Sequence, residues 1–535
     1  MESRFTHHFG TNYVPTDEEI EVLGADLLCR TEELTRIDGR IRELSEQRDK
    51  LLAYIEPRQA LISHPRRLPL DILEAIFLAC LPTGRNAVMS AQEAPLLLCR
   101  ICSAWRTAAL SMPRLWASLH IPIAFIYAKS DTRRPALEQW LTRAAASAMR
   151  LSLCNMSTPW DVSSTSDDEV AALVELVAKF SPRWQNVEFT WMTSSNAAAR
   201  ALAGIHTPRL ESFTFAGHLS DFSHFDQVLN SPRLRAVSLS SSKLALVPTL
   251  PIAWHQLTTL VIHSAQEGRS SISLADFISL FGRCPQLVSF QVALRVEDPP
   301  FDYRSLSVTM SFLEEFTVVP SYLYFHNWYL ACIMHCVSMP KLRRFHFPIL
   351  ESVGSESDNF SLASVGEKYP LLEDLAIHLA SLNSQALLNV LHSFPALTRL
   401  VANACPLLRG DGDVWNSDWD SQRDSCGTAR LLETLLDTTV CPQLRELEIM
   451  EAKALNKHTL VTFLSARVQV ESASQLRSLS ISFQTAWDDS KHSTIPHLSP
   501  AEREYYCSLG LTISFFPHTP PKHPDAPSPW TGLPL

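Results

Sequence analysis

The sequence of 535 residues is poor in glycine and lacks the short motifs that most often mark an active site. Its 15 glycines fall well below the usual share of about 7% of residues, so loops that cradle phosphate groups are scarce. It contains no Gly-x-x-x-x-Gly-Lys-Ser/Thr, Gly-x-Gly-x-x-Gly, His-Glu-x-x-His or Gly-x-Ser-x-Gly motif. We therefore predict a protein that is not an enzyme and that needs no cofactor.

The chain also lacks a basic excess and a long apolar run. Its 46 Lys and Arg residues against 56 Asp and Glu residues give a formal net charge of −10, which argues against a nucleic-acid-binding protein. No stretch of 18 apolar residues occurs, and the N-terminal residues have no apolar core of a signal peptide. We expect an intracellular protein, cytoplasmic and/or nuclear, that binds neither nucleic acid nor membrane.

Metal-binding patterns are also missing. The twelve cysteines are scattered, and many lie in apolar segments, as small buried side chains do in a reducing compartment. Cys99 and Cys102 are spaced like zinc ligands, but no second ligand pair follows at a finger spacing. In the acidic segment 411–420, Trp415 occupies the position of the third ligand of an EF-hand loop. No metal site is expected.

Among the patterns that are present, the first is a heptad repeat from Ile20 to Ile55, in which nine of the eleven apolar-seam positions are Leu or Ile. This pattern predicts a coiled-coil helix, which we place at residues 17–57, after a disordered N-terminus at 1–16. Two arginines interrupt the seam, and a parallel dimer would set Glu33 against Asp38 without a compensating pair. Residues 20–55 thus permit self-association without specifying it; packing on the rest of the protein or on another partner fits equally well.

Three short apolar helical patterns follow between residues 68 and 116. The first begins at a Leu-Pro pair, the second ends at Trp105, and the third follows Pro113. So small a set of helices hides only about 60% of its unfolded surface, so part of its apolar surface is expected to contact a partner.

The segment 62–120 resembles an F-box domain of the fungal type. The matching residues are the Leu-Pro start, Ile101-Cys-x-x-Trp105-Arg and the closing Leu115-Trp116, whereas the connection over residues 81–95 is longer than usual. The resemblance implies binding to the adaptor subunit of a cullin-RING (SCF-type) ubiquitin ligase and, through it, to a cullin. The residues that it assigns to adaptor binding are Leu68, Pro69, Ile72, Leu73, Ile76, Phe77, Ile101, Trp105 and Trp116. The alternative is that they form only an internal helical core.

Downstream, a motif of the form (Pro)-x-Leu-x-x-Φ-x-Φ, with Φ apolar, recurs in ten clear copies from Leu210 to Ile481 and in two weaker copies before them. Apolar residues two apart indicate a strand, and the segments between copies are helical in pattern. The array resembles degenerate leucine-rich repeats and predicts a curved α/β solenoid over residues 130–484, in a protein that is α/β (α+β overall). One spacing of 47 indicates either a degraded copy or an insertion. A large α/β domain with repeated strand starts is the alternative.

The inner strand face of such a solenoid is a candidate surface for a target protein. Its charge is mixed and becomes more acidic toward the C-terminus, which favours a basic partner, although a solvated strand face is the simpler interpretation. The candidate target-binding residues on it are His263, Arg344, His346, Asp374, His378, Arg399, Glu446 and Glu448. The last segment, 485–535, contains 9 of the 34 prolines and is expected to be mostly disordered.

Together these patterns predict a substrate-receptor subunit of a ubiquitin ligase. The F-box-like segment would bind the ligase adaptor and the solenoid would bind an unknown target, whose effective concentration near the ligase would rise. The alternative is a non-catalytic scaffold that uses the coiled coil and the solenoid without a ligase.

Overall fold

The structure is a computed structural model that describes residues 5–62, 68–155, 167–191, 197–217, 223–241, 244–264, 271–272, 274–293, 295–296, 307–318, 333–346, 362–379, 382, 384–404, 425–452, 455–468, 476–484, 498–518, 529–530 and 533. The chain forms two compact units, Met1–Ile76 (unit 1) and Phe77–Leu535 (unit 2). We describe each unit by itself.

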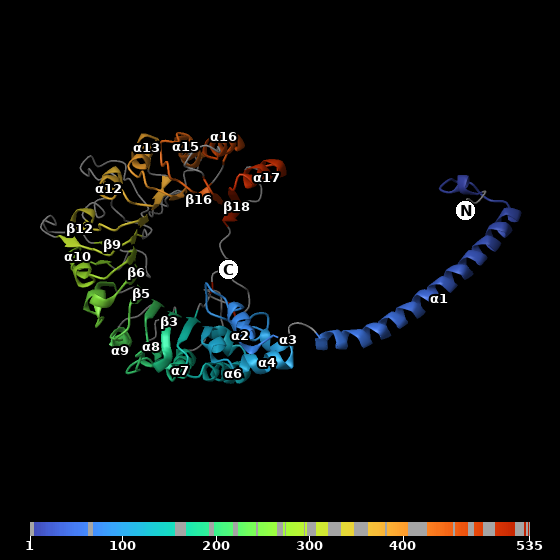
Figure 1. Cartoon of the computed structure of the whole chain (residues 1–535), viewed down its shortest axis with the longest axis horizontal. Coiled ribbons are helices and arrows are strands. Elements are labelled where there is room, and N and C mark those ends of the chain that lie inside the picture. The colour runs from blue at the N-terminus through green and yellow to red at the C-terminus, as the bar shows by residue number, and fades with distance from the viewer. Residues whose placement is uncertain are drawn as a thin grey trace. The chain divides into compact units, whose positions relative to one another are not determined.

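Unit 1 contains one long helix, α1, which runs from Asp17 to Ile62 (Figure 1). Its 46 residues correspond to a length of about 69 Å. The helix covers the predicted range 17–57, continues to Ile62 and contains Pro57 near its end. The coiled-coil pairing of this helix stays a prediction.

The N-terminal segment differs from the predicted disorder over residues 1–16. A 3₁₀ turn, η1, spans Thr6–His8, and the rings of His8 and Tyr13 stack with their centroids 3.7 Å apart. Thr16 and Glu19 form a capping box, in which Glu19 N donates to Thr16 Oγ1 at 3.4 Å and Thr16 N donates to Glu19 Oε2 at 2.9 Å. These contacts hold the chain before α1, so the prediction of disorder is wrong for residues 5–16.

Four short helical segments cover the F-box-like range: α2 (Leu70–Ala79), α3 (Leu98–Ile101), α4 (Ser103–Leu110) and the 3₁₀ turn η3 (Pro113–Trp116). The predicted second helix is broken at Cys102, whose extended backbone separates α3 from α4 and whose Sγ accepts a hydrogen bond from Trp105 N at 3.4 Å. The predicted third helix is the single turn η3, in which buried Trp116 donates Nε1–H to Ala109 O at 2.9 Å.

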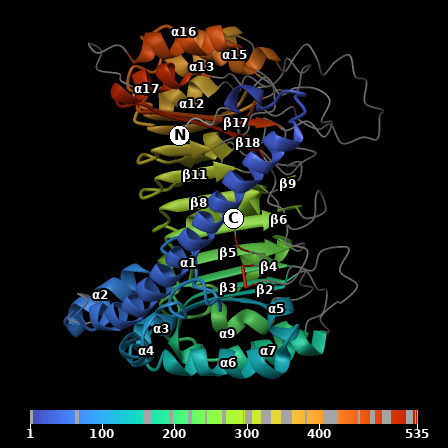
Figure 2. The same cartoon turned by 90° about the vertical axis from the view of Figure 1, so that its right-hand side faces the viewer.

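The main feature of unit 2 is one parallel sheet of fourteen strands, hydrogen-bonded in chain order (Figure 2). Each strand between β1 and β18 thus pairs with the strand of the preceding repeat and with that of the following one. The strands are β1 (Ser118–Pro122), β2 (Met149–Asn155), β3 (Trp184–Trp191), β4 (Ser212–Gly217), β5 (Ala236–Ser241), β6 (Thr259–Ser264), β8 (Ser289–Ala293), β11 (Glu315–Val318), β13 (Arg344–His346), β14 (Asp374–His378), β15 (Arg399–Asn403), β16 (Glu446–Ala452), β17 (Ser478–Gln484) and β18 (Thr512–His518).

Helices connect these strands and lie on the outer side of the curve that the sheet follows within unit 2 (Figure 1). Two short strand pairs, β7 (Ser271–Ile272) with β9 (Arg295–Val296) and β10 (Val308–Thr309) with β12 (Val337–Ser338), lie outside the main sheet. The helices are α5 (Ile123–Tyr127), α6 (Ser130–Arg143), α7 (Asp167–Ala178), α8 (Ala197–Arg200), α9 (Asp226–Leu229), α10 (Leu274–Arg283), α12 (Leu362–Lys368), α13 (Ser384–His392), α15 (Ser425–Thr434), α16 (Lys457–Arg467) and α17 (Pro500–Ser508). Strand, helix and return therefore repeat along the unit, which is a solenoid with a long parallel sheet.

The repeated apolar motif forms the core of the solenoid. All twelve predicted copies fall on strands, from β2 to β17, and their first Φ residues occupy one buried row across the sheet. Within this row the rings of Phe290, Phe316 and Phe345 follow one another at centroid distances of 5.8 Å. No single repeat can enclose such a row, so each strand is stabilised by the side chains of its neighbours.

Both ends of the sheet extend beyond the predicted range 130–484. Strand β1 begins at Ser118 and pairs with β2, and β18 ends at His518 and pairs with β17. A capping box between Ser499 and Glu502 starts α17. The predicted boundary at residue 120 therefore falls inside a strand, and the prediction of a mostly disordered tail from 485 is wrong for residues 498–518. Backbone pairing with the last full repeat stabilises this segment despite its prolines.

The long spacing between two motif copies is an insertion. Strand β15 pairs directly with β16, with Arg399 opposite Glu446, so no additional strand of the sheet lies between these two. The alternative of a degraded copy is wrong. The acidic segment 411–420 lies outside the described residues.

The connection over residues 81–95 covers the free edge of the first strand. His120 N donates to Ala87 O at 2.7 Å, and Val88 forms a parallel bridge with His120. The connection is held in shape by Glu93, which pairs with Arg85 at 2.7 Å and accepts a hydrogen bond from Val88 N at 2.9 Å. Because an uncovered edge strand can pair with other chains, this connection protects one end of the sheet.

Candidate functional site

A row of charged residues of alternating sign crosses five neighbouring strands of unit 2. Glu315 on β11, Arg344 on β13, Asp374 on β14, Arg399 on β15 and Glu446 on β16 are register partners in that order. Each precedes a buried residue of the core row, so its side chain lies on the opposite face of the sheet from the core. We call these five residues, together with His346 and Glu448, the charged network.

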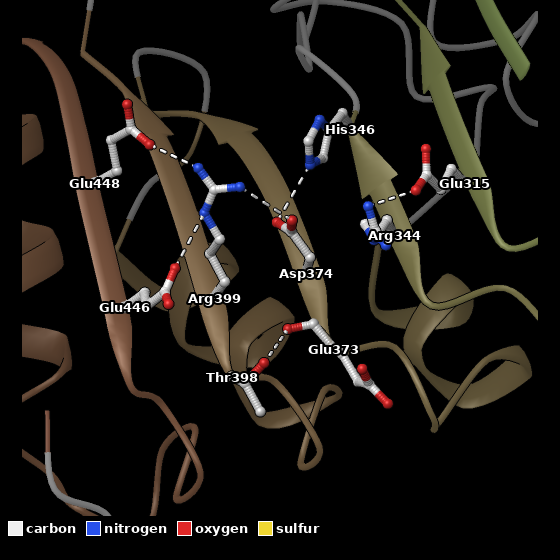
Figure 3. A network of polar contacts seen from close by, with 9 residues as sticks. All are labelled: Glu315, Arg344, His346, Glu373, Asp374, Thr398, Arg399, Glu446 and Glu448. Carbon is white, nitrogen blue, oxygen red and sulfur yellow. Dashed lines mark hydrogen bonds and ion pairs between the residues drawn. The ribbon is translucent and has the colours of Figure 1, made fainter. Parts of the chain in front are cut away.

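Arg399 is the centre of the charged network (Figure 3). Its guanidinium lies 3.4 Å from Asp374 Oδ2, 3.6 Å from Glu446 Oε2 and 2.9 Å from Glu448 Oε2. On the other side of Asp374, His346 Nε2 lies 3.2 Å from Oδ1. Four successive strands, β13 to β16, are thus connected through one arginine and one aspartate.

Arg344 forms a second centre, because it makes an ion pair with Glu315. Glu315 Oε2 also accepts a hydrogen bond from Ser289 Oγ at 3.0 Å, which extends the contacts to β8. One residue before the charged row, Arg343 pairs with Glu373 at 3.1 Å, and Thr398 Oγ1 donates to the Glu373 carbonyl oxygen at 3.1 Å. Figure 3 shows the last contact beside the network.

The electrostatics of the network favour a cationic partner. Burial disfavours the charge of Arg399, but Asp374, Glu448 and Glu446 outweigh that effect and raise the pKa of Arg399 above its ordinary value. The network contains two guanidinium groups and four carboxylates, which leaves an excess of two negative charges when His346 is neutral. The side chain of Glu446 is 59% exposed, so its carboxylate is available to a partner.

The structure brings together six of the eight predicted target-binding residues. Asp374 is only 7% exposed, which corrects its prediction as an exposed position: its neighbours on β13 and β15 cover it. His263 lies on β6, separated from β13 by β8 and β11, and burial lowers its pKa. His378 is the last residue of β14, and its side chain is outside the described part of the chain. Glu315 was not among the predicted residues, although it occupies the same motif position as Arg344.

The predicted adaptor-binding residues divide into an exposed and a buried set. The exposed set comprises Pro69, Ile72 and Ile76, all in unit 1, and Ile101 in unit 2. Two further residues, Leu68 and Trp105, are half-buried. The buried residues are Leu73, Phe77 and Trp116, at 7%, 0% and 0% exposure. These three side chains belong to the core, so the prediction that they contact an adaptor directly is corrected.

The part of the F-box-like segment that belongs to unit 2 packs on the start of the solenoid. The ring of Phe77 lies 5.0 Å from that of Trp105, and Trp116 packs edge-on against Trp140 of α6 at 4.9 Å. Arg143 of α6 lies over the Trp116 ring at 4.9 Å from its centroid. Exposed Ile101 is therefore carried by a segment that shares a core with the sheet.

A second feature of unit 2 is a cleft of about 440 Å³ at the N-terminal end of the sheet. It is lined by Arg85 and Asn86 of the edge-covering connection, His120 of β1, Arg150 of β2 and Leu533 near the C-terminus. His120 is buried and its Nδ1 lies 2.8 Å from Ser152 Oγ, which in turn accepts from Asn86 Nδ2 at 3.0 Å. These polar groups hold the covering connection against the first two strands.

The described residues show neither a metal site nor a membrane-spanning helix. They contain no group of three or more His, Cys, Asp or Glu side chains that could hold a metal ion. None of the helices in the described ranges is long and apolar enough to cross a membrane.

Comparisons with known proteins find similarity only among solved structures. No family model matches the chain, and no curated protein matches it. The Rad7 and Elc1 complex from yeast aligns with 77% of this chain and 94% of the other at 15% identity and a TM-score of 0.34. The leucine-rich repeat-containing protein LegL7 from Legionella pneumophila aligns with 58% of this chain and 89% of its own length, at 14% identity and a TM-score of 0.29.

A TLR13–ssRNA13 complex aligns with 57% of this chain at 12% identity and a TM-score of 0.28, over 43% of the other chain. At such scores these likenesses assign neither a family nor a function. The solenoid architecture stands on the strand order and register of the chain itself.

Proposed function

We propose that the chain is a non-catalytic substrate receptor of a cullin-RING ubiquitin ligase. The F-box-like segment binds the ligase adaptor, and the charged network binds a target protein with a basic segment. One observation carries the first half: the residues that resemble the F-box motif separate into a buried core and exposed apolar side chains. Exposed aliphatic groups on short helices are the chemistry expected of a docking surface for another protein.

The buried set supports the same proposal, because it gives the exposed set a rigid base. Buried Trp116 packs against Trp140, and buried Phe77 packs against Trp105, at the start of unit 2, whereas Ile101 on α3 is 53% exposed. An adaptor bound at Ile101 would be held at a fixed distance from the charged network. The target would then be positioned by geometry, which raises the rate of modification without chemistry from this chain.

The target half of the proposal follows from charge. The network carries an excess of carboxylates on the open face of the sheet, and Glu446 and Glu448 lie at the more exposed end of it. A lysine- or arginine-containing segment would gain charge-assisted hydrogen bonds there. Such contacts weaken as the salt concentration rises.

The test of adaptor binding uses exposed positions, so that the fold is left intact. We expect Ile72→Asp together with Ile101→Asp to abolish co-purification of adaptor and cullin without lowering the melting temperature. Leu371→Asp, at a solenoid position that is 69% exposed, is the matched control and should retain both partners. Retention of the adaptor by the double variant, or no adaptor bound by the unmodified chain, contradicts the ligase role and leaves the scaffold alternative.

A further inference from the structure

The apolar seam of α1 is exposed at all of its Leu and Ile positions except half-buried Leu23. Eight of its Leu and Ile residues are each between 40% and 63% exposed: Ile20, Leu27, Leu34, Ile37, Ile41, Leu44, Leu51 and Ile55. So long a row of exposed aliphatic side chains usually marks an interaction surface. The occupant can be inferred from the charged residues in and beside the seam.

A parallel pairing with a second copy of α1 is unfavourable. Each seam residue would face the same residue of the second copy, so Arg30 would face Arg30 and Arg48 would face Arg48. Beside the seam, Glu33 would face Asp38 in both directions. Four like-charge contacts therefore oppose this arrangement.

An antiparallel pairing removes all of these contacts. When Leu34 faces Ile37 of the second copy, Arg30 faces Ile41 and Arg48 faces Leu23. Every layer from Ile20 to Leu51 then contains at least one Leu or Ile, and no layer contains two arginines. The long aliphatic stems of the arginines can cover the neighbouring apolar groups while their charges reach the edge.

The same register makes the flanking charges complementary. Glu33 lies opposite Arg40 of the second copy, Arg48 lies beside Asp26, and Arg30 lies beside Asp38, and the two-fold symmetry repeats each contact. Within one helix, Arg30 already pairs with Asp26 at 3.5 Å and with Glu33 at 3.7 Å, so its guanidinium is held at the acidic edge of the seam.

Neighbouring registers lose this complementarity. A shift of the second copy by one heptad in one direction places Arg30 opposite Arg48 and Arg40 opposite itself. The same shift in the other direction places Glu33 opposite itself and shortens the overlap. Among these arrangements only one combines the longest charge-compatible seam with opposite charges on its edges.

We propose that α1 pairs with α1 of a second copy of this chain as an antiparallel coiled coil in which Leu34 faces Ile37. The dimer presents two charged networks to one target, so a target with two basic segments gains avidity. The pairing itself rests on α1 alone and is independent of any ligase adaptor.

The test is sedimentation equilibrium of the full-length chain and three variants at low salt. In the antiparallel dimer, Glu33→Arg places an arginine opposite Arg40 of the second copy at two symmetry-related contacts. We expect the dissociation constant of the dimer to rise about tenfold. The double variant E33R/R40E restores opposite charges and should return to the value of the unmodified chain. Glu32→Arg makes the same charge change on the helix face opposite the seam and should leave the dimer unchanged.

Each alternative has its own outcome. In a parallel dimer Glu33→Arg would face Asp38, so tighter association of this variant overturns the antiparallel arrangement. A monomeric full-length chain at the highest concentration overturns the dimer, and α1 then binds a different protein. Equal dissociation constants for Glu33→Arg and Glu32→Arg place the contact between copies outside α1 and also overturn the proposal.

Discussion

Arg399 is the residue whose removal tests the charged network most directly. Arg399→Met keeps most of the side-chain volume and removes the positive charge that Asp374, Glu446 and Glu448 share. Asp374 is then left with His346 as its partner, although its own side chain is only 10% exposed. The variant therefore leaves a nearly buried carboxylate with half of its contacts.

The expected loss can be worked out pair by pair. The contacts of Arg399 with Glu446 and Glu448 join side chains that are at least one third exposed, and such pairs contribute about 0.5 kcal/mol each. Removing one partner of a fully buried pair costs about 3–5 kcal/mol; because Arg399 itself is 40% exposed, we take about 2 kcal/mol for Asp374. The free energy of unfolding should therefore fall by about 3 kcal/mol in total.

Urea denaturation followed by circular dichroism measures this change, and Arg343→Met is the matched control. Arg343 precedes Arg344 of the charged row in sequence and pairs with Glu373, but both side chains are about half exposed, at 58% and 47%. Its removal should cost no more than about 0.5 kcal/mol. Equal losses for the two variants would refute the assignment of Arg399 as the centre of the network.

A double variant identifies the cause of the loss. If the uncompensated carboxylate of Asp374 destabilises Arg399→Met, then R399M/D374N should recover about 1 kcal/mol or more. No recovery would mean that the arginine acts through its stem and not through its charge.

Three further predictions concern other parts of unit 2. Arg467→Met should lower the free energy of unfolding by about 3 kcal/mol in urea, because the buried guanidinium donates to the carbonyls of Leu435, Asp437, Val440 and Cys441; a loss below that of Arg343→Met contradicts this role. Gly366→Ala should lower the free energy of unfolding by about 1–3 kcal/mol, because the added Cβ would lie 2.5 Å from Ser393. Gly282→Ala adds a Cβ where there is open space, so in the same urea titration it should leave the free energy of unfolding unchanged or raise it. Lys457 and the Ser499 cap lower the pKa of Glu502 from 4.5 to about 2. The contribution of Glu502 to the stability of α17 is therefore complete above pH 4.5 and is lost as the pH falls toward 2. Hydrogen exchange of α17 should become faster over this pH range, and Glu502→Gln should abolish this pH dependence.

The repeat array could be predicted because its signal is local. Each motif copy carries its strand and its core residue within a few positions, and all twelve copies are strands. Strands β1 and β18 were missed because their spacing differs by one residue from the three positions of the motif. Leu115 lies four positions before Leu119, and Leu511 lies two positions before Ile513, where Leu119 and Ile513 are the residues in register with the core row. Pairing with a neighbouring strand stabilises both in spite of the altered spacing.

The candidate site was predicted in part for the same reason. Alternation within each strand identified which residues share the face of the charged network, because side chains two apart point the same way. It did not identify Arg399 as the centre, since that depends on the register of β14, β15 and β16. Nor did it separate Leu73, Phe77 and Trp116 from the exposed members of the F-box-like set, because burial depends on packing between helices.

By itself, the sequence determined the long heptad helix, the parallel-strand repeat and the charge of the strand face, since each is written in the spacing of residues close together along the chain. Only the tertiary structure decided which charges pair, that the long connection over 81–95 covers β1, and that β15 pairs directly with β16 across the long spacing. These features arise from contacts between residues that are far apart in the chain. The free energy of such contacts depends on strand register and on burial, and the periodicity of one segment predicts neither of them.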